Sequence, residues 1–217
     1  MRQRSNRTAR GRPIITLTSD FGLRDSYVAA MKAVLIGHCP DARLIDVTHQ
    51  VPPRDVLCGS ITLERAVDGF PKGTVHLAVV DPGVGTNRRL IIAQINGQLI
   101  VCPDNGLVTW SWRLHPGARA LEITWRPARA SNTFHGRDIL APVAGMLAAG
   151  RRVLTVARTI GNPVMLDLAP AQPTRNAGRI IQIDHFGNAT TNIPYERLGD
   201  NSRVEVQLRG RNIGRLN

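Results

Sequence analysis

Short apolar segments alternate with amphipathic segments between residues 14 and 149, and this alternation restricts the possible folds more than any other feature of the chain. Residues 75–80 are apolar at every position except His76, which is typical of a strand buried on both faces of a parallel sheet. The pattern therefore predicts an α/β fold with a largely parallel sheet. We expect strands at residues 14–18, 43–47, 75–80, 90–95 and 99–101, and helices at residues 26–36, 56–66 and 137–149.

Other parts of the sequence have a different character. Residues 1–13 contain five arginines and no acidic residue, which is typical of a disordered basic tail. Residues 166–179 are rich in proline, alanine and glycine without periodicity, so we expect a linker after an α/β domain at residues 14–165. Residues 180–217 show strand patterns and no helical pattern, which predicts a small all-β domain. Its strands are expected at residues 180–183, 190–193 and 204–208.

The net charge of +12 could indicate a nucleic-acid partner, but the distribution of the charge argues against one. Only Lys32 and Lys72 are lysines, many arginines lie at the two ends of the chain, and no known nucleic-acid-binding pattern accompanies them. No run of 18 apolar residues is present, so we expect no membrane span. The three cysteines, Cys39, Cys58 and Cys102, lie far apart, which favours reduced thiols in a cytoplasmic protein over disulfides or a zinc site.

The segment VVDPGVGTNRR, residues 79–89, joins two predicted strands. It lacks the third glycine of a dinucleotide-binding motif, and the strand pattern that follows offers no helix N-terminus for a phosphate. Its glycines instead allow a tight turn that places Asp81 at the end of one strand and Arg88 at the start of the next. Two interpretations remain open: a glycine turn closed by a surface ion pair, or part of a functional site.

Two further polar residues are expected near the same edge of the sheet. Asp20 follows the first strand, and His135 precedes a helix. Because ligands bind at the carboxyl ends of parallel strands, Asp20 and His135 could form one site with Asp81 and Arg88. The alternatives are structural: Asp20 as a helix-capping or turn residue, and His135 as a residue of a helical first turn.

Five segments resemble, in order and spacing, the S-adenosylmethionine (SAM) hydroxide adenosyltransferase family, which is related to fluorinating and chlorinating enzymes. They are TSDFG (18–22), VVDPGVGTNRR (79–89), PDNG (103–106), FHGRD (134–138) and DHFGNATTNI (184–193). The similar region extends over residues 14–208. The resemblance implies cleavage of SAM by water into adenosine and methionine, on an α/β domain followed by a barrel-like β domain. It also implies a homotrimer with active sites between subunits.

The resemblance further implies roles for individual residues. The family's Asp-Arg-His triad matches Asp81, Arg88 and His135, and the acid that holds the ribose hydroxyls matches Asp20. In the β domain, Asp184 matches the residue that meets the methionine ammonium group, and Phe186 and Asn188 match residues near the adenosine.

The chemistry of SAM cleavage is consistent with these residue types. Methionine leaves the sulfonium as a neutral thioether, so the leaving group needs no acid and no metal, and we expect no cofactor. The attacking water must be aligned and must lose a proton. His135 is the triad member with a suitable reference pKa, so we hypothesise that Arg88, fixed by Asp81, positions the water while His135 takes the proton.

Two alternative functions are a halide-dependent SAM-cleaving enzyme and a catalytically silent protein that binds adenosine or SAM. The halogenating relatives lack the acid and the histidine of the triad, and the fluorinating ones also carry serine at the position of Gly136, which favours hydrolysis here. Two departures from the family pattern stand out. Arg54 occupies the position of an aromatic residue that covers the ribose, and relatives continue beyond the last strand of this chain, so we expect an incomplete β domain.

Overall fold

The computed structural model describes residues 11–168, 177–193, 198 and 204–215. The chain divides into two compact units between Leu166 and Asp167. Most of the expected tail at residues 1–13, and residues 169–176 of the expected linker, lie outside the described residues.

One mixed sheet forms the centre of the first unit. Among the described residues it contains seven strands in the order β2-β1-β3-β5-β4-β6-β7. The first four pair in parallel, and each later neighbour pairs antiparallel. Because β6 and β5 are both antiparallel to β4, β6 runs in the same direction as the parallel strands. The strands are β1 (Ile14–Ser19), β2 (Arg43–Thr48), β3 (Val75–Val79), β4 (Leu90–Ile95), β5 (Gln98–Pro103), β6 (Arg119–Ile123) and β7 (Ala157–Ile160).

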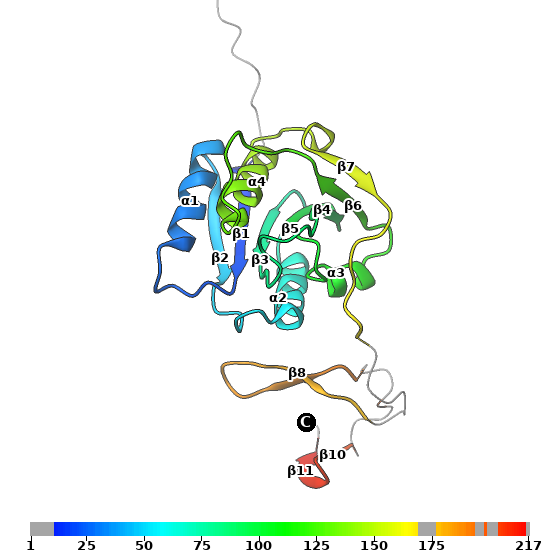
Figure 1. Ribbon diagram of the computed structural model, residues 1–217. Coiled ribbons are helices and arrows are strands. Elements are labelled where there is room, and N and C mark those ends of the chain that lie inside the picture. Colours follow the sequence, from blue (N-terminus) through cyan, green and yellow to red (C-terminus); the bar gives the residue numbers. More distant parts are fainter. Residues whose placement is uncertain (1–10, 169–176, 194–197, 199–203, 216–217) are drawn as a thin grey trace, which may run out of the picture. The chain divides into compact units, whose positions relative to one another are not determined.

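Helices cover both faces of this sheet (Figure 1). Helices α1 (Tyr27–His38) and α4 (Ala141–Ala148) pack on one face, and α2 (Val56–Gly69) and the short α3 (Thr109–Leu114) lie on the other. Side chains of β3 and of the next residue, Val80, point alternately to the two faces of the sheet. Leu77 and Val79 join one hydrophobic core, and Ala78 and Val80 join the other. The predicted α/β fold with a largely parallel sheet is therefore confirmed.

The structure differs from the sequence prediction in several elements. The predicted helix at 137–149 begins with a π-helical turn, η1 (Gly136–Leu140), before α4. Elements of the first unit that were not predicted include α3, which is only six residues long, and the strands β6 and β7. Residues 119–123 and 157–160 are short segments with charged residues at partly exposed positions, so neither has a strong apolar period.

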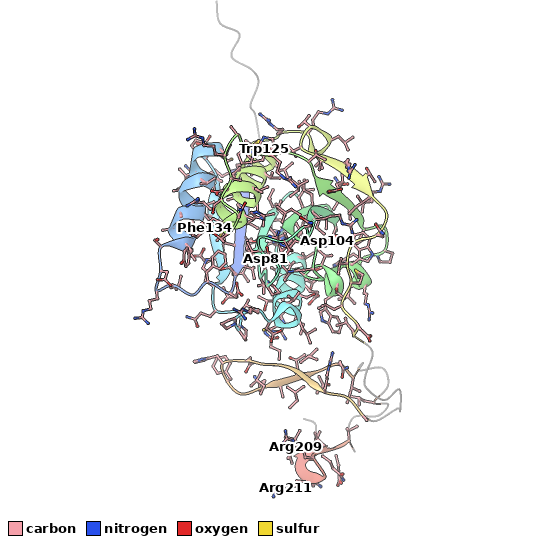
Figure 2. All side chains as sticks on the ribbon, in the orientation of Figure 1. Asp81, Asp104, Trp125, Phe134, Arg209 and Arg211 are labelled. Atoms are coloured by element: carbon pink, nitrogen blue, oxygen red, sulfur yellow. The ribbon has the colours of Figure 1, made fainter. Side chains whose placement is uncertain are left out.

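The second unit is built from β-hairpins. Strand β8 (Ile180–Ile183) pairs antiparallel with β9 (Ala189–Thr191), and β10 (Glu205–Leu208) pairs antiparallel with β11 (Arg211–Arg215). The unpredicted strand β11 contains Gly214, and the left-handed residues Arg209 and Gly210 form the turn before it (Figure 2). The prediction that the C-terminal region is small and built from β-strands is thus confirmed. The strands that the structure describes there form two separate sheets and no barrel.

A buried polar network joins the centre of the sheet to α2. The Thr16 hydroxyl lies 2.7 Å from His76 Nδ1, His76 Nε2 donates to Gln98 Oε1, and Gln98 Nε2 donates to the Val67 carbonyl at 2.6 Å. Burial lowers the pKa of His76, against the opposing effect of its hydrogen bond to Gln98. The imidazole is therefore neutral in the folded protein near pH 7.

This network predicts a loss of stability on mild acidification. An unfolded histidine binds a proton near pH 6.5, whereas folded His76 does so only at lower pH. Stability must therefore fall as the pH drops below about 6.5, because the unfolded state binds more protons there. Urea unfolding at about pH 7.5 and about pH 5.5 should show this loss, and the loss should be smaller in His76→Gln. Equal losses in both proteins would refute the assignment to His76.

Candidate active site

A cavity of about 860 Å³ opens in the first unit beyond the carboxyl ends of β1 and β3. Asp20 directly follows β1, Asp81 lies two residues after the end of β3, and Phe134 and Gly136 come from the start of η1. Asp81 and Phe134 are labelled in Figure 2. The position agrees with the general location of ligand sites in parallel sheets, and the volume is in the usual range for small-molecule pockets.

Asp81 and Arg88 form a two-pronged ion pair. Arg88 Nε donates to Asp81 Oδ1 at 2.6 Å, and Arg88 Nη2 donates to Asp81 Oδ2. The two side chains are only 6% and 9% exposed, so the alternative of a surface ion pair is wrong. The turn between them needs its glycines: Gly85 has φ +82°, and a Cβ on Gly83 would stand 3.1 Å from Arg88 Cδ. The glycines of the turn therefore allow the Arg88 side chain to reach back to Asp81.

Arg89, the next residue, is anchored elsewhere. Its Nε donates to Asp104 Oδ2 at 2.7 Å, and its Nη2 donates to the Asn162 carbonyl at 2.7 Å. The Asp104 side chain, which is labelled in Figure 2, is 1% exposed and also accepts from the Val164 N–H at 2.7 Å. Consecutive arginines thus have separate buried partners, which fixes the start of β4. Sequence reasoning did not assign this role to Asp104, although the PDNG segment was a signal for it.

His135 completes the chain of polar contacts. Arg88 Nη1 lies 3.1 Å from His135 Nδ1, and because a guanidinium nitrogen can only donate, Nδ1 must accept. Burial and the positive charge of Arg88 lower the pKa of His135, against the opposing effect of the Asp81 carboxylate. We therefore assign a neutral ring near pH 7 whose proton is on Nε2. The predicted triad residues are thus brought together by the structure.

Asp20 stands on the other side of the cavity. Its Oδ2 accepts from the Arg54 N–H at 2.8 Å, and within the described residues its Oδ1 has no hydrogen-bond partner. Asp20 does not cap a helix, since Arg54 lies outside any helix and has a left-handed φ of 66°. One carboxylate oxygen is therefore available for a ligand.

An aromatic group beside the cavity was missed by sequence reasoning. Phe21 and Tyr27 have ring centroids 6.0 Å apart, and Tyr27 and Phe134 have centroids 5.9 Å apart. The Arg137 guanidinium lies 4.9 Å from the Phe134 centroid. All four residues line the cavity, so it offers apolar ring surface as well as carboxylates. No spacing in the sequence marks these rings as neighbours, because they come from separate loops and helices.

The predicted residues of the second unit lie in one turn, between β8 and β9. Asp184 Oδ1 accepts from the N–H groups of Phe186 at 2.9 Å and Asn188 at 2.8 Å, and Oδ2 accepts from Asn188 Nδ2 at 2.8 Å. The hydrogen bonds from Asn188 lower the pKa of Asp184, so it is ionised near pH 7. Phe186 is 86% exposed. The turn thus presents a carboxylate and an aromatic ring together.

No group of three or more His, Cys, Asp or Glu side chains is arranged to hold a metal ion in the part of the chain that the structure describes. None of the helices in that part is long and apolar enough to cross a membrane.

The contact between Arg88 and His135 predicts a measurable change in titration. Arg88→Gln removes the positive charge that lowers the pKa of His135, so this pKa should rise. NMR titration of the ring protons of His135 measures it. Arg89→Gln is the matched control, because Arg89 is bonded to Asp104, and it should leave the titration of His135 unchanged. An unchanged or lower pKa in Arg88→Gln would contradict the assigned contact.

Comparison with known proteins shows the family of the chain. Sequence models of the SAM hydroxide adenosyltransferase N-terminal and C-terminal domains match residues 15–157 and 178–217. An (R)-S-adenosyl-L-methionine hydrolase from Salinispora arenicola is 43% identical over 203 residues, which cover 88% of this chain and 77% of the relative. A fluorinase from Actinoplanes sp. is 30% identical in an alignment that covers 92% of this chain and 79% of the relative. A conserved protein from Thermotoga maritima has a crystal structure that aligns with a TM-score of 0.77 at 40% identity, covering 84% of this chain and 72% of that one. The chain therefore belongs to the SAM hydroxide adenosyltransferase family.

Proposed function

We propose that this protein hydrolyses SAM to adenosine and L-methionine by attack of water at C5′ of the ribose. The observation that carries the proposal is the Asp81–Arg88–His135 chain of polar contacts, in which Asp81 lines the cavity that also holds Asp20. Relatives at 43% and 39% identity are named (R)-S-adenosyl-L-methionine hydrolase, which supports hydrolysis and favours the (R) configuration at sulfur.

The donors of Arg88 explain how water could be held. A guanidinium has five N–H bonds, of which two point to Asp81 and one to His135. The remaining two are available to an attacking oxygen, and their positive charge stabilises the negative charge that grows on it. Arg88 is therefore proposed to orient the water, with Asp81 fixing the guanidinium.

The hydrogen bonding of His135 restricts how it could act as the base. Its Nδ1 lone pair is occupied by Arg88 Nη1, so it can accept a proton only when that bond is released. We propose that the His135 ring moves away from Nη1 and toward the water as the reaction begins, while Asp81 keeps the guanidinium in place. The water O–H bond then breaks toward Nδ1, the C5′–O bond forms, and the C5′–S bond breaks with both electrons going to sulfur. His135 ends as an imidazolium, and methionine leaves as a neutral thioether.

The predicted binding residues are proposed to keep the roles that the family resemblance implies. Asp20 is proposed to accept hydrogen bonds from the ribose hydroxyls through its available oxygen. Asp184 is proposed to meet the methionine ammonium group, with Phe186 and Asn188 near the adenosine. Arg54, which lines the cavity where an aromatic cover was expected, leaves apolar contact with the ribose to the rings near Phe21.

We further propose a homotrimer, a cytoplasmic location, and catalysis without a metal or other cofactor. The exposure of the large side chains Tyr27, Phe134 and Phe186 supports burial against other copies of the chain. The odd number and wide spacing of the cysteines support a reducing compartment. The neutral leaving group removes the need for a Lewis acid.

The alternative functions are not favoured. A halide-dependent enzyme would not need the buried triad, and the fluorinase relative is less similar than the hydrolases. A silent binding protein would not explain why Arg88 retains unused donors beside the cavity.

The first test identifies the nucleophile. Incubation with SAM in ¹⁸O-labelled water should give adenosine carrying the label on its 5′ oxygen, because water attacks C5′. Turnover should persist in EDTA, and added chloride or fluoride should give no halogenated nucleoside. Mass spectrometry of the products checks all three points. A 5′-halogenated product, or turnover that EDTA abolishes and a divalent ion restores, would contradict the proposal.

The second test separates chemistry from binding. His135→Ala should lower kcat by about a hundredfold or more with little change in adenosine affinity, as for a lost general base. Asp20→Ala should weaken adenosine binding by about 1.5 to 3 kcal/mol, because the ribose hydroxyls lose a charged acceptor. Calorimetric titration, steady-state kinetics and melting temperatures distinguish these roles. If both variants lose only thermal stability, the two residues are structural and the site is misplaced.

A further inference from the structure

The turn that carries Asp20 is held by the chain segment at residues 49–54. Asp20 follows the last residue of β1, and the segment follows the neighbouring strand β2. Three hydrogen bonds from main-chain N–H groups join the turn to the segment: Gly22 N to His49 O at 2.7 Å, Val51 N to Ser19 O at 3.3 Å, and Arg54 N to Asp20 Oδ2 at 2.8 Å. The position of Asp20 therefore depends on Arg54, which lines the cavity, and on the turn contacts of His49 and Val51, which do not line it.

A buried side-chain pair strengthens this connection. Ser19 Oγ lies 2.7 Å from His49 Nδ1, and the two residues are 0% and 3% exposed. Ser19 Oγ also accepts from the Phe21 N–H at 3.4 Å, so the hydroxyl spans the backbone on both sides of Asp20. If the contact between Ser19 and His49 were lost, the turn would be less firmly held at Asp20.

The other ring nitrogen of His49 faces a carboxylate. His49 Nε2 lies 3.0 Å from Asp46 Oδ1. The angle of this contact does not meet the geometry of a hydrogen bond, so the two groups interact as charge and dipole. Because a carboxylate attracts a proton at this distance, we assign the Nε2–H form, in which Nδ1 accepts from the Ser19 hydroxyl. Lys32 Nζ holds the same carboxylate at 2.6 Å. Partial burial raises the pKa of Asp46, but the contacts with Lys32 and His49 outweigh it and lower this pKa, so Asp46 is ionised near pH 7.

The local backbone places His49 for this purpose. The register between β1 and β2 shifts so that Leu17 pairs with Asp46 and Thr18 pairs with Thr48, which leaves Val47 as an extra residue in β2. An extra residue of this kind changes which side chains point to each face of the sheet beyond it. His49 follows the end of β2 and its side chain is buried, whereas the Asp46 side chain within β2 is exposed.

We propose that His49 is a positioning residue for the ligand-binding carboxylate of Asp20, acting through Ser19 and the turn that follows it. The inference rests on the proposed function, in which Asp20 holds the ribose. The order Ser19–His49–Asp46 is not a nucleophilic triad, because Ser19 is fully buried and binds Nδ1, the nitrogen that faces the acid in such triads. His49 instead helps to fix the orientation of the Asp20 carboxylate.

The same strand supplies a matched control. Thr16 Oγ1 and His76 Nδ1 are also 2.7 Å apart, both residues are fully buried, and this second hydroxyl–imidazole pair does not contact the Asp20 turn. Ser19→Ala and Thr16→Val each remove one buried hydroxyl from β1. Both variants should melt at lower temperature, because each leaves a histidine nitrogen without its partner.

Only the variant next to the site should change ligand binding. Ser19→Ala should weaken adenosine binding and raise KM for SAM by about five- to thirtyfold, the effect of losing 1 to 2 kcal/mol of positioning, with kcat at saturation nearly unchanged. Thr16→Val should retain wild-type affinity and KM. Titration calorimetry with adenosine provides a readout that does not require turnover.

Two substitutions of His49 test whether the contact of Nδ1 with Ser19 is the one that positions Asp20. The amide of His49→Asn can reach the position of Nδ1 and accept from Ser19, whereas the longer His49→Gln places its amide near the position of Nε2. Adenosine affinity should therefore be closer to wild type in His49→Asn than in His49→Gln. If His49→Gln does not fold, Ser19→Ala, which removes a single oxygen atom, decides the question.

The outcomes separate this inference from the proposed function. Wild-type protein that binds adenosine but does not release it from SAM refutes the proposed hydrolysis and leaves the comparison of variants valid. Unchanged adenosine affinity in Ser19→Ala, or equal weakening in Thr16→Val, overturns the positioning role of His49 whether or not SAM is hydrolysed.

Discussion

The buried ion pair between Asp81 and Arg88 is the interaction on which the rest of the site depends. Removing a guanidinium from water is costly unless its donors are satisfied, and Asp81 satisfies two of them in the geometry that a planar fork requires. With the guanidinium fixed, a third donor holds His135 in one protonation state. The two remaining donors gain a defined direction, which a flexible arginine on the surface would not have.

The two sides of the cavity use a similar structural device. Arg88 belongs to the chain of polar contacts in the site, while Arg89 next to it is anchored by buried Asp104. Asp20 lines the cavity, while Ser19 next to it is anchored by buried His49. In each case the position of the functional side chain is fixed by the buried contacts of its sequence neighbour. The charged side chain is then already ordered before the ligand binds, so binding loses less conformational entropy.

Much of this arrangement could be predicted from the sequence. The apolar periods located the strands up to β5, and the glycine-rich segment placed Asp81 just after β3 and Arg88 just before β4, although β5 separates these two strands in the sheet. The aromatic group around Tyr27 and the pairing of Ser19 with His49 could not be predicted. They depend on side chains from different elements and, for His49, on the extra residue Val47 in β2, which changes the alternation on which sequence patterns rely.

The central claim is that Asp81 acts through Arg88 and has no separate role in the chemistry. A double-mutant cycle with Asp81→Asn and Arg88→Lys, measured as kcat/KM for SAM, tests it most directly. Asp81→Asn keeps the shape of the side chain but removes its charge, and Arg88→Lys keeps the charge but removes the planar fork. The account predicts that the double variant is no slower than Arg88→Lys alone, because residues that act as one unit give non-additive losses. Losses that multiply in the double variant would contradict it.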